Sequence, residues 1–270
     1  MKKIFYSILI FLLILLNFST VCADDVDNEG EFENTVEVTA SSVTALPKTN
    51  SRRYIVYDRI SKSMIIGKNE DVKSAMASTT KIMTSIVILE KADLDEMVTV
   101  SAKAGGTGGS RLGLKKGDKA SVKNLLYGLM LRSGNDAAVA LAEHVGGSVK
   151  EFAEIMNEKA SELGLTNTHF VTPHGLDDAN HYTTALELAK LTDYAMNNET
   201  FAKIVGTKSI TIYINNQPRQ INNTNELLGT LNGVVGVKTG FTNNAGRCLV
   251  TETKRNNMDI ITIVLGADTK

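Results

Sequence analysis

The segment 81–91 constrains the fold of this chain more than any other, because it is predicted to form a helix that is apolar on most of its faces. Such a helix is stable only where other elements cover it. We therefore predict that this helix is buried inside the folded domain. Its apolar side chains are Ile82, Met83, Ile86, Val87, Ile88 and Leu89.

Hydrophobic periodicity and end signals predict the other elements. Helices are predicted over residues 122–131, 135–145, 152–163 and 185–196, and strands over 54–57, 64–66, 210–214, 234–239, 248–252 and 260–265. Two strands, a helical block and a run of strands therefore follow one another. This order is typical of an α+β domain in which the first hairpin joins the late strands in one antiparallel sheet.

The N-terminus has the pattern of a secretory signal peptide over residues 1–23. Lys2 and Lys3 precede an apolar stretch over 4–18, and small residues surround a cleavage site after Ala23. We therefore expect export to the outer side of a bacterial membrane. The apolar stretch is shorter than the roughly 20 residues of a membrane span, but retention as an uncleaved anchor stays open.

Residues 24–53 are predicted to be a flexible acidic and polar linker, and residues 54–270 the folded domain. Cleavage leaves Cys248 as the single cysteine, so we predict no internal disulfide and a small buried thiol in a strand. The 29 basic and 30 acidic residues lack the basic excess that nucleic-acid binding needs. No His and Cys cluster has the spacing of a zinc site.

The motif Ser78-Thr79-Thr80-Lys81 opens the predicted buried helix, where residues three apart share one face. A lysine amine beside a serine hydroxyl can take its proton if burial or nearby positive charge lowers the pKa of the amine. The helix N-terminus also favours the negative charge of acyl transfer. On a solvent-exposed helix the same spacing would carry no function.

Two further motifs could supply polar groups to one site. Ser133-Gly134-Asn135 lies between predicted helices, where its hydroxyl could relay a proton and its amide could hold a substrate amide or the lysine. An ordinary turn with a helix N-cap is the alternative. Lys238-Thr239-Gly240 ends a Val-rich strand, where a cation and a hydroxyl suit a carboxylate; a solvated strand end is the alternative. Gly240 would let a ligand backbone approach closely.

The three motifs, in this chain order, are the signature of class A β-lactamases and penicillin-binding proteins. From about Tyr54 to Lys270 the sequence resembles the low-molecular-mass penicillin-binding proteins that act as serine D-alanyl-D-alanine carboxypeptidases. The resemblance implies the β-lactamase/transpeptidase-like fold, with an antiparallel sheet flanked by helices and an all-helical subdomain. The matching segments are Met76-Ala77-Ser78-Thr79-Thr80-Lys81-Ile82-Met83-Thr84, Gly109-Ser110-Arg111, Leu131-Arg132-Ser133-Gly134-Asn135-Asp136-Ala137, Pro173-His174-Gly175-Leu176, His181-Tyr182-Thr183-Thr184-Ala185, Asn223-Thr224-Asn225 and Gly236-Val237-Lys238-Thr239-Gly240.

The resemblance also implies catalytic roles. Ser78 would attack the carbonyl of the penultimate D-Ala in a peptidoglycan stem peptide, and Lys81 would be the general base. Ser133 would pass a proton to the leaving D-Ala, and Asn135 would position the substrate or Lys81. β-Lactams would acylate Ser78 as covalent inhibitors. No metal or organic cofactor takes part in this scheme.

Substrate binding is implied for the last motif. Lys238 and Thr239 would hold the terminal carboxylate of the peptide beside Gly240. The backbone N–H groups of Ser78 and Phe241 would form the oxyanion hole. This scheme leaves no task for the side chains of the two histidines near the motifs, so structural roles are expected for His174 and His181.

The end of the chain departs from the family pattern. Family members usually continue with a helix that packs on the sheet and then a β-rich domain. We therefore expect the β-rich domain to be absent, one sheet face to be uncovered and membrane attachment to be undetermined. Two other functions stay open: a class A β-lactamase, for which Glu162 is the nearest candidate for the deacylating carboxylate, and a non-catalytic relative that only binds penicillin or peptidoglycan.

Overall fold

The computed structural model describes residues 48–268, so the predicted signal peptide and most of the predicted linker lie outside the described residues. Strand β1 (Ser51–Asp58) begins before Tyr54, where the sequence had placed the start of order. Ser51 pairs with Ala267 and Arg53 with Leu265 on a neighbouring strand. The polar start of β1 lacks the alternation of apolar residues that reveals a strand, which explains the difference.

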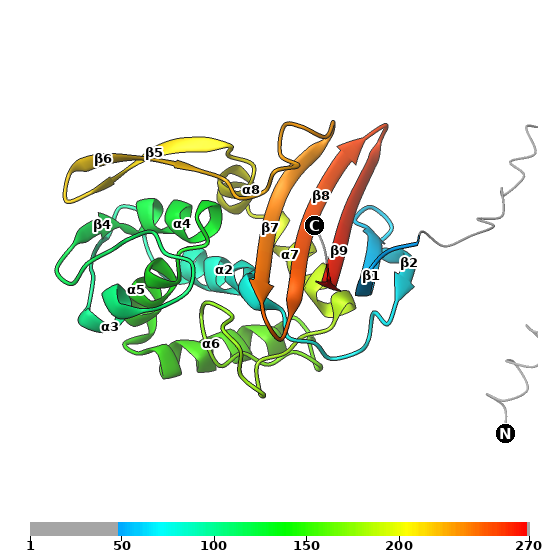
Figure 1. Cartoon of the computed structure of the whole chain (residues 1–270), viewed down its shortest axis with the longest axis horizontal. Coiled ribbons are helices and arrows are strands. Elements are labelled where there is room, and N and C mark those ends of the chain that lie inside the picture. The colour runs from blue at the N-terminus through cyan, green and yellow to red at the C-terminus, as the bar shows by residue number, and fades with distance from the viewer. Residues whose placement is uncertain (1–47, 269–270) are drawn as a thin grey trace, which may run out of the picture. The chain divides into compact units, whose positions relative to one another are not determined.

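Five antiparallel strands form one sheet in the order β2-β1-β9-β8-β7 (Figure 1). The prediction that the first hairpin joins the late strands is confirmed. In the central strand, Ile261 and Ile263 are fully buried while Thr262 between them is half-buried, as expected for a strand with one face toward the core. The remaining strands of this sheet are β2 (Ser63–Lys68), β7 (Val234–Thr242), β8 (Gly246–Arg255) and β9 (Met258–Ala267).

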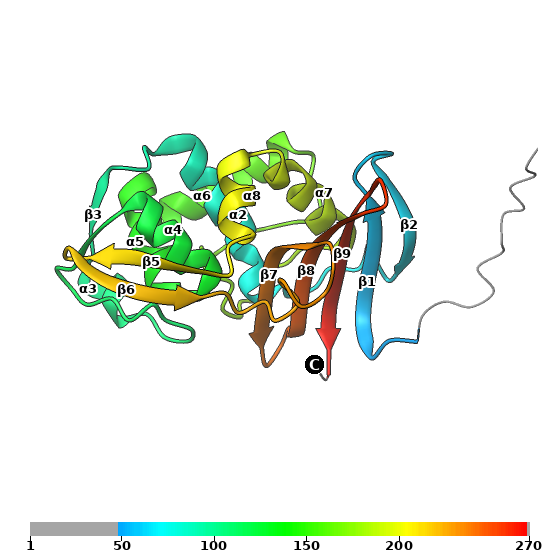
Figure 2. The same ribbon diagram turned by 90° about the horizontal axis from the view of Figure 1, so that it is seen from above.

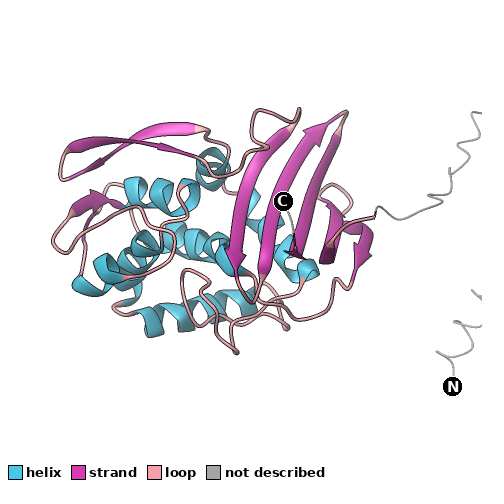
Figure 3. Ribbon diagram, viewed as in Figure 1, coloured by secondary structure: helices cyan, strands magenta, loops and turns pink. Residues whose placement is uncertain are grey.

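Helix α2 (Lys81–Lys91) lies at the centre of the helical part, as its apolar faces require. Every residue from Lys81 to Ile88 is buried, and α2 contacts α4, α5, α6, α7 and α8. Figures 2 and 3 show these helices gathered on one side of the sheet. The helical elements are η1 (Ala77–Thr80), α3 (Ala102–Gly106), α4 (Val122–Leu131), α5 (Asn135–Gly146), α6 (Val149–Glu162), α7 (Ala185–Met196) and α8 (Glu199–Val205).

Hydroxyl side chains cap the N-termini of four of these helices, among them α3, where Ser101 accepts the backbone N–H of Ala104. Ser121, Ser148 and Thr184 each precede a helix, and the side-chain oxygen of each accepts a hydrogen bond from the backbone N–H three residues later. This bond satisfies one of the N–H groups that the first helical turn leaves unpaired. The predicted limits of α4 and α7 therefore agree with the observed ones.

One predicted strand lies outside the main sheet. Residues 210–214 belong to β5 (Ser209–Ile214), which pairs only with β6 (Gln217–Asn222) and packs over α4. The sequence did not reveal β6 because Pro218 disfavours a strand and Ile221 is its single buried apolar side chain. The short pair β3 (Met97–Thr99) and β4 (Lys119–Ser121) was also not predicted.

The two faces of the main sheet differ. Helices α7 and α8 contact one face. On the other face the apolar side chains of Val56, Leu249 and Val264 remain half-buried within residues 48–268. In this part of the chain no helix combines the length and apolar character needed to cross a membrane.

Arg59 joins the sheet to helix α7 through buried ion pairs. Its guanidinium group donates to the carboxylates of Asp193 (Nε to Oδ1, 2.9 Å), Asp259 (Nη1 to Oδ2, 3.0 Å) and Glu252. The side chain of Glu252 is fully buried, and this burial raises the pKa of its carboxyl group. The positive charge of Arg59 therefore offsets the cost of burying the Glu252 carboxylate.

We expect Arg59→Met to lower the free energy of unfolding by about 3–5 kcal/mol, because it leaves a buried carboxylate facing only the half-exposed Lys254. Urea denaturation followed by circular dichroism measures the change. Arg52→Met is the matched control, since Arg52 is exposed and lies 3.9 Å from Asp268. It should cost less than about 1 kcal/mol. Equal losses in the two variants would contradict the role given to Arg59.

Candidate active site

The turn that carries Ser78 is held by the two threonines that follow it. In η1, Thr79 Oγ1 donates to the carbonyl oxygen of Met76 (2.7 Å), and Thr80 Oγ1 donates to that of Ala77 (2.8 Å). Ala77 has a φ of 48°, a left-handed conformation that residues other than glycine seldom adopt. These bonds fix the half-buried Ser78 just before the first turn of α2.

The loop around Gly175 closes against the same turn. Gly175 has a φ of 84°, and a Cβ atom there would lie 1.9 Å from the carbonyl oxygen of Ala77, so only glycine fits. His181 Nε2 lies 2.8 Å from Thr80 Oγ1, and its Nδ1 accepts the N–H of Val171 (2.9 Å). Because Nδ1 accepts, Nε2 carries the proton and donates to Thr80. Burial lowers the pKa of His181 to about 4 and keeps the ring neutral.

Lys81 connects three segments of the chain through its amine. Nζ lies 2.9 Å from Ser78 Oγ, 2.8 Å from Asn135 Oδ1 and 2.8 Å from the carbonyl oxygen of His174. The side chain of Lys81 is fully buried. The shared helix face predicted from the spacing of Ser78 and Lys81 is therefore confirmed.

Burial and the neighbouring charge of Lys238 favour the neutral form of the Lys81 amine. Desolvation and the neighbouring Lys238 lower the pKa of Lys81 well below its ordinary value, and Asp136 opposes them less strongly. A neutral amine has two N–H donors, which match the carbonyl oxygens of Asn135 and His174, and one lone pair. The lone pair then faces Ser78 Oγ, so that Lys81 can accept the proton of this hydroxyl.

Asn135 and Ser133 lie at the start of α5. The Nδ2 group of Asn135 donates to the carbonyl oxygen of Gly108 (2.8 Å), which turns its Oδ1 toward Lys81. Ser133 is buried and has a φ of 57°, but its hydroxyl makes no hydrogen bond to a residue within 48–268. The structure therefore joins Asn135 to the Ser78–Lys81 pair and leaves the Ser133 hydroxyl without a bond in this state.

Asp136 fixes the loop that faces the start of α5. Its buried carboxylate accepts the backbone N–H groups of Leu112 (2.8 Å), Gly113 (2.7 Å) and Leu114 (2.9 Å). The backbone N–H of Asn135 donates to Ser110 in the same loop (2.8 Å). Three charge-assisted bonds to one carboxylate hold this loop in a single arrangement.

The third motif lies on β7, at the edge of the sheet. Lys238 is buried, its Nζ donates to the carbonyl oxygen of Thr239 (2.8 Å), and burial lowers its pKa to about 7. Thr239 Oγ1 lies 2.9 Å from Thr224 Oγ1. A Cβ atom on Gly240 would lie 3.0 Å from the backbone nitrogen of Ser78, so β7 passes directly beside the turn. The three motifs therefore meet around Ser78 and Lys81.

Phe241 and Arg247 flank this region on adjacent strands. The ring of Phe241 is 58% exposed, and the guanidinium carbon of Arg247 lies 5.4 Å from its centroid. Cys248, next in β8, is buried as predicted, and burial raises the pKa of its thiol to about 11. The thiol is therefore protonated and inert at neutral pH.

Sequence reasoning missed partners that act through backbone atoms. His174 was expected to be structural, and its imidazole has a pKa lowered by burial to about 3, yet its carbonyl oxygen holds the Lys81 amine. A carbonyl is common to every residue, so residue type gave no signal for it. Thr224 stands in the matching segment Asn223-Thr224-Asn225, which could have indicated its contact with Thr239.

The β-lactamase alternative finds no support in the position of its candidate residue Glu162. Glu162 is the exposed last residue of α6, and its carboxylate forms an ion pair with Lys159 Nζ at 2.6 Å, as expected for a solvated helix end rather than a deacylating group. Among residues 48–268, no group of three or more His, Cys, Asp and Glu side chains could hold a metal ion.

Comparisons with known proteins agree with this geometry. Residues 38–269 match the family described as D-alanyl-D-alanine carboxypeptidase. DacF, a D-alanyl-D-alanine carboxypeptidase of Bacillus subtilis, is 38% identical over 80% of this chain and 57% of its own length. DacC of Escherichia coli is 39% identical over 85% of this chain and 60% of its own length. The chain thus spans about three-fifths of these relatives.

Solved structures show the same fold. The Streptomyces K15 DD-transpeptidase superposes with a TM-score of 0.79 at 34% identity, over 83% of this chain and 93% of that one. The D-alanyl-D-alanine carboxypeptidase DacD of Francisella tularensis gives a TM-score of 0.77 at 32% identity, over 83% and 68%. The predicted transpeptidase-like fold is confirmed.

The buried lysines predict a bell-shaped pH dependence for the acylation of Ser78 by a β-lactam. The rate constant should rise with pH while Lys81 loses its proton, because only the neutral amine can act as a base. It should fall again as Lys238, with a pKa of about 7, loses the charge that holds the carboxylate of the reagent. Stopped-flow measurement of the second-order rate constant tests both limbs.

Lys238→Arg is the informative control, because a guanidinium group keeps its charge at all accessible pH values. In this variant the alkaline limb should disappear while the acidic limb remains. An unchanged alkaline limb would show that another group causes it.

Proposed function

This chain belongs to the D-alanyl-D-alanine carboxypeptidase family, and we propose that it removes the terminal D-Ala from peptidoglycan stem peptides through an acyl-enzyme on Ser78. The observation that carries the proposal is the position of the buried Lys81 amine, 2.9 Å from Ser78 Oγ. Because its other two contacts are fixed carbonyl oxygens, the amine presents its lone pair to the serine.

In the acylation step, Ser78 Oγ attacks the carbonyl carbon of the penultimate D-Ala while Lys81 takes the hydroxyl proton. The tetrahedral intermediate then loses the terminal D-Ala as the C–N bond breaks. The leaving amine receives a proton from Lys81 through the hydroxyl of Ser133, which has no other bond within the described residues. Asn135 keeps the Lys81 amine in place during both transfers.

Water completes the cycle. Lys81, neutral again after proton transfer, takes a proton from a water molecule that attacks the ester carbonyl. The ester bond to Ser78 Oγ breaks, and the serine recovers its proton. The shortened peptide leaves with a new carboxylate on its last residue.

Negative charge on the tetrahedral oxygen is stabilised by backbone groups. The N–H groups of Ser78 and Phe241 are suited to this role because β7 passes within contact distance of the turn at Gly240. Oxyanion-hole donors of this kind are worth about 3 kcal/mol each. The N-terminus of α2 adds a favourable field at the same place.

The peptide carboxylate is held at the edge strand. Lys238 supplies the positive charge, and Thr239, with Thr224 beside it, supplies a hydroxyl. Since β7 has a neighbour on one side only, the peptide can add to its free edge as a further strand. This pairing would align the scissile carbonyl with Ser78. β-Lactams carry a carboxylate and an acyl group in the same arrangement and would acylate Ser78 as inhibitors.

We further propose that the protein acts outside the cell, on the wall side of a bacterial membrane. The signal-peptide pattern over residues 1–23 supports export, and the polymer that carries the stem peptides lies there. Mass spectrometry of the protein recovered from the cell envelope and the medium should give a chain that begins at Asp24. A chain that retains Met1 would contradict cleavage and favour an anchor.

Release of D-Ala from diacyl-L-Lys-D-Ala-D-Ala tests the activity. The parent chain should release D-Ala, and Ser78→Ala should lower kcat by at least about a thousandfold, because the covalent route is lost. Ser161→Ala is the matched control, since Ser161 lies exposed on α6. Adding an amine acceptor such as glycylglycine tests whether the acyl-enzyme is hydrolysed by water or transfers its acyl group to the amine.

Three results would point elsewhere. Covalent labelling of Ser78 by penicillin without D-Ala release would favour the binding-only alternative. Rapid turnover of penicillin would favour a β-lactamase. Equal D-Ala release by the parent and Ser78→Ala would remove Ser78 from the mechanism.

A further inference from the structure

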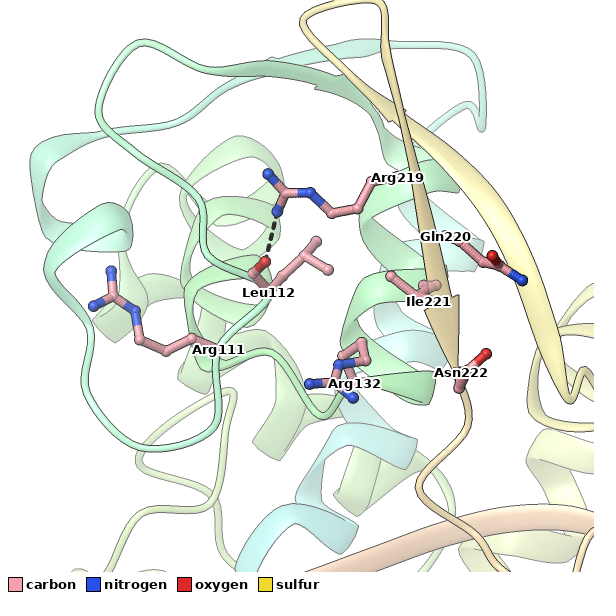
Figure 4. A pocket seen from close by; sticks show the side chains of 7 residues that line it. All are labelled: Arg111, Leu112, Arg132, Arg219, Gln220, Ile221 and Asn222. Carbon is pink, nitrogen blue, oxygen red and sulfur yellow. Dashed lines mark hydrogen bonds between the residues drawn. The ribbon is translucent and has the colours of Figure 1, made fainter.

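A pocket of about 470 Å³ is formed by three separate segments of the chain. Arg111 and Leu112 come from the loop before β4, Arg132 follows helix α4, and Arg219 lies on β6 (Figure 4). Three of the seven residues that line the pocket are arginines. A pocket of this kind is suited to an anionic group rather than to an apolar ligand.

Arg219 is held in a fixed orientation. Its Nη1 donates to the carbonyl oxygen of Leu112 at 2.6 Å, and its neighbour on the same face of β6, Ile221, is buried. Figure 4 shows these two side chains on the pocket side of β6, while Gln220 and Asn222 point away. The other donors of the Arg219 guanidinium group make no hydrogen bond within residues 48–268, so they can bind a ligand.

Arg132 supplies a second cation. Among the described residues, no carboxylate forms an ion pair with Arg132 or Arg219. The guanidinium group of Arg111 extends away from both and donates to the carbonyl oxygen of Gly105. Two guanidinium groups without a countercharge in one pocket attract an anion, and their planar N–H donors match a carboxylate.

Each segment of the pocket continues into the catalytic residues. Arg132 immediately precedes Ser133. Arg111 follows Ser110, whose carbonyl oxygen accepts the backbone N–H of Asn135. The end of β6 at Asn222 leads within two residues to Thr224, which contacts Thr239. A ligand bound at Ser78 could therefore extend directly into the pocket.

We propose that this pocket binds a carboxylate that the stem peptide carries upstream of its D-Ala-D-Ala end; this proposal rests on the proposed function. Stem peptides offer two such groups, the α-carboxylate of a γ-linked glutamate and the side-chain carboxylate of a diamino-dicarboxylic residue next to D-Ala. An extended peptide advances about 3.5 Å per residue. Both carboxylates therefore lie within one or two residues of the acylated carbonyl of the peptide. Arg132 is correspondingly close to the reaction, because it immediately precedes Ser133 in the chain.

Four pentapeptides of the form L-Ala-γ-D-Glu-X-D-Ala-D-Ala distinguish the two sources, where X is a diamino-dicarboxylic residue. Each of the two upstream carboxyl groups is either free or converted to an amide. Amidation of the bound carboxyl group should lower kcat/KM for D-Ala release about tenfold, as expected for lost charge-assisted hydrogen bonds. Amidation of the other group should change it little.

Variants locate the effect in the pocket. In Arg219→Gln and Arg132→Gln, the ratio of kcat/KM for the acid to kcat/KM for its amide should fall toward one. This ratio is insensitive to general losses of folding or activity, because both substrates meet the same enzyme. Arg255→Gln is the matched control: it removes an equal charge from the exposed end of β8 and should leave the ratio unchanged.

Equal kcat/KM for all four peptides in the parent chain, with D-Ala released from each, would overturn the pocket proposal and leave the proposed function standing. If no peptide releases D-Ala, the proposed function is wrong. Calorimetric measurement of the affinity of Ser78→Ala for the four peptides then tests whether the pocket binds the carboxylate. A tenfold acid-to-amide difference in affinity that Arg219→Gln removes would support it, and a ratio near one would overturn it.

Discussion

The burial of the Lys81 amine is the constraint on which the rest of the site depends. Burial of a lysine is costly for the ammonium form, so the position of Lys81 at the start of an apolar helix selects the base. The amine needs partners, and they come from Ser78, Asn135 and the carbonyl of His174. The turn before α2, the start of α5 and the loop around Gly175 must therefore all be in place before the serine can react.

The sheet meets this arrangement from the other side. Its edge strand β7 passes close to the turn, where a Cβ atom on Gly240 would lie 3.0 Å from the backbone nitrogen of Ser78. The opposite part of the sheet is connected to α7 by the ion pairs of Arg59. Helices and sheet thus hold one another at a fixed separation around Ser78. The pocket of Arg132 and Arg219 depends on a third contact, that of the β5–β6 hairpin with the loop at Leu112.

The sequence predicted those parts of the structure that are determined by the type and spacing of side chains. The apolar faces of α2, the hydrophobic periodicity of the other helices and the three motifs indicated the buried helix, the fold and the residues around Ser78. Contacts made by backbone atoms, such as the His174 carbonyl with Lys81, carry no residue signal and were missed. Strand β6 was missed because its stability comes from pairing with β5, and the arginine pocket because its segments meet only in the folded chain.

The pairing of the first strand with the last has a consequence for how the protein is made. Ser51 in β1 pairs with Ala267 in β9. Strand β1 therefore lacks its partner β9 until almost the whole domain has been synthesised. Pairing strands so far apart in the chain costs conformational entropy before the pairing contacts form. Topologies of this kind therefore fold slowly. Ser78 is made early and Lys238 late, so no N-terminal fragment holds a complete site. A chain whose synthesis has not yet reached β7 therefore cannot bring the three motifs together around Ser78.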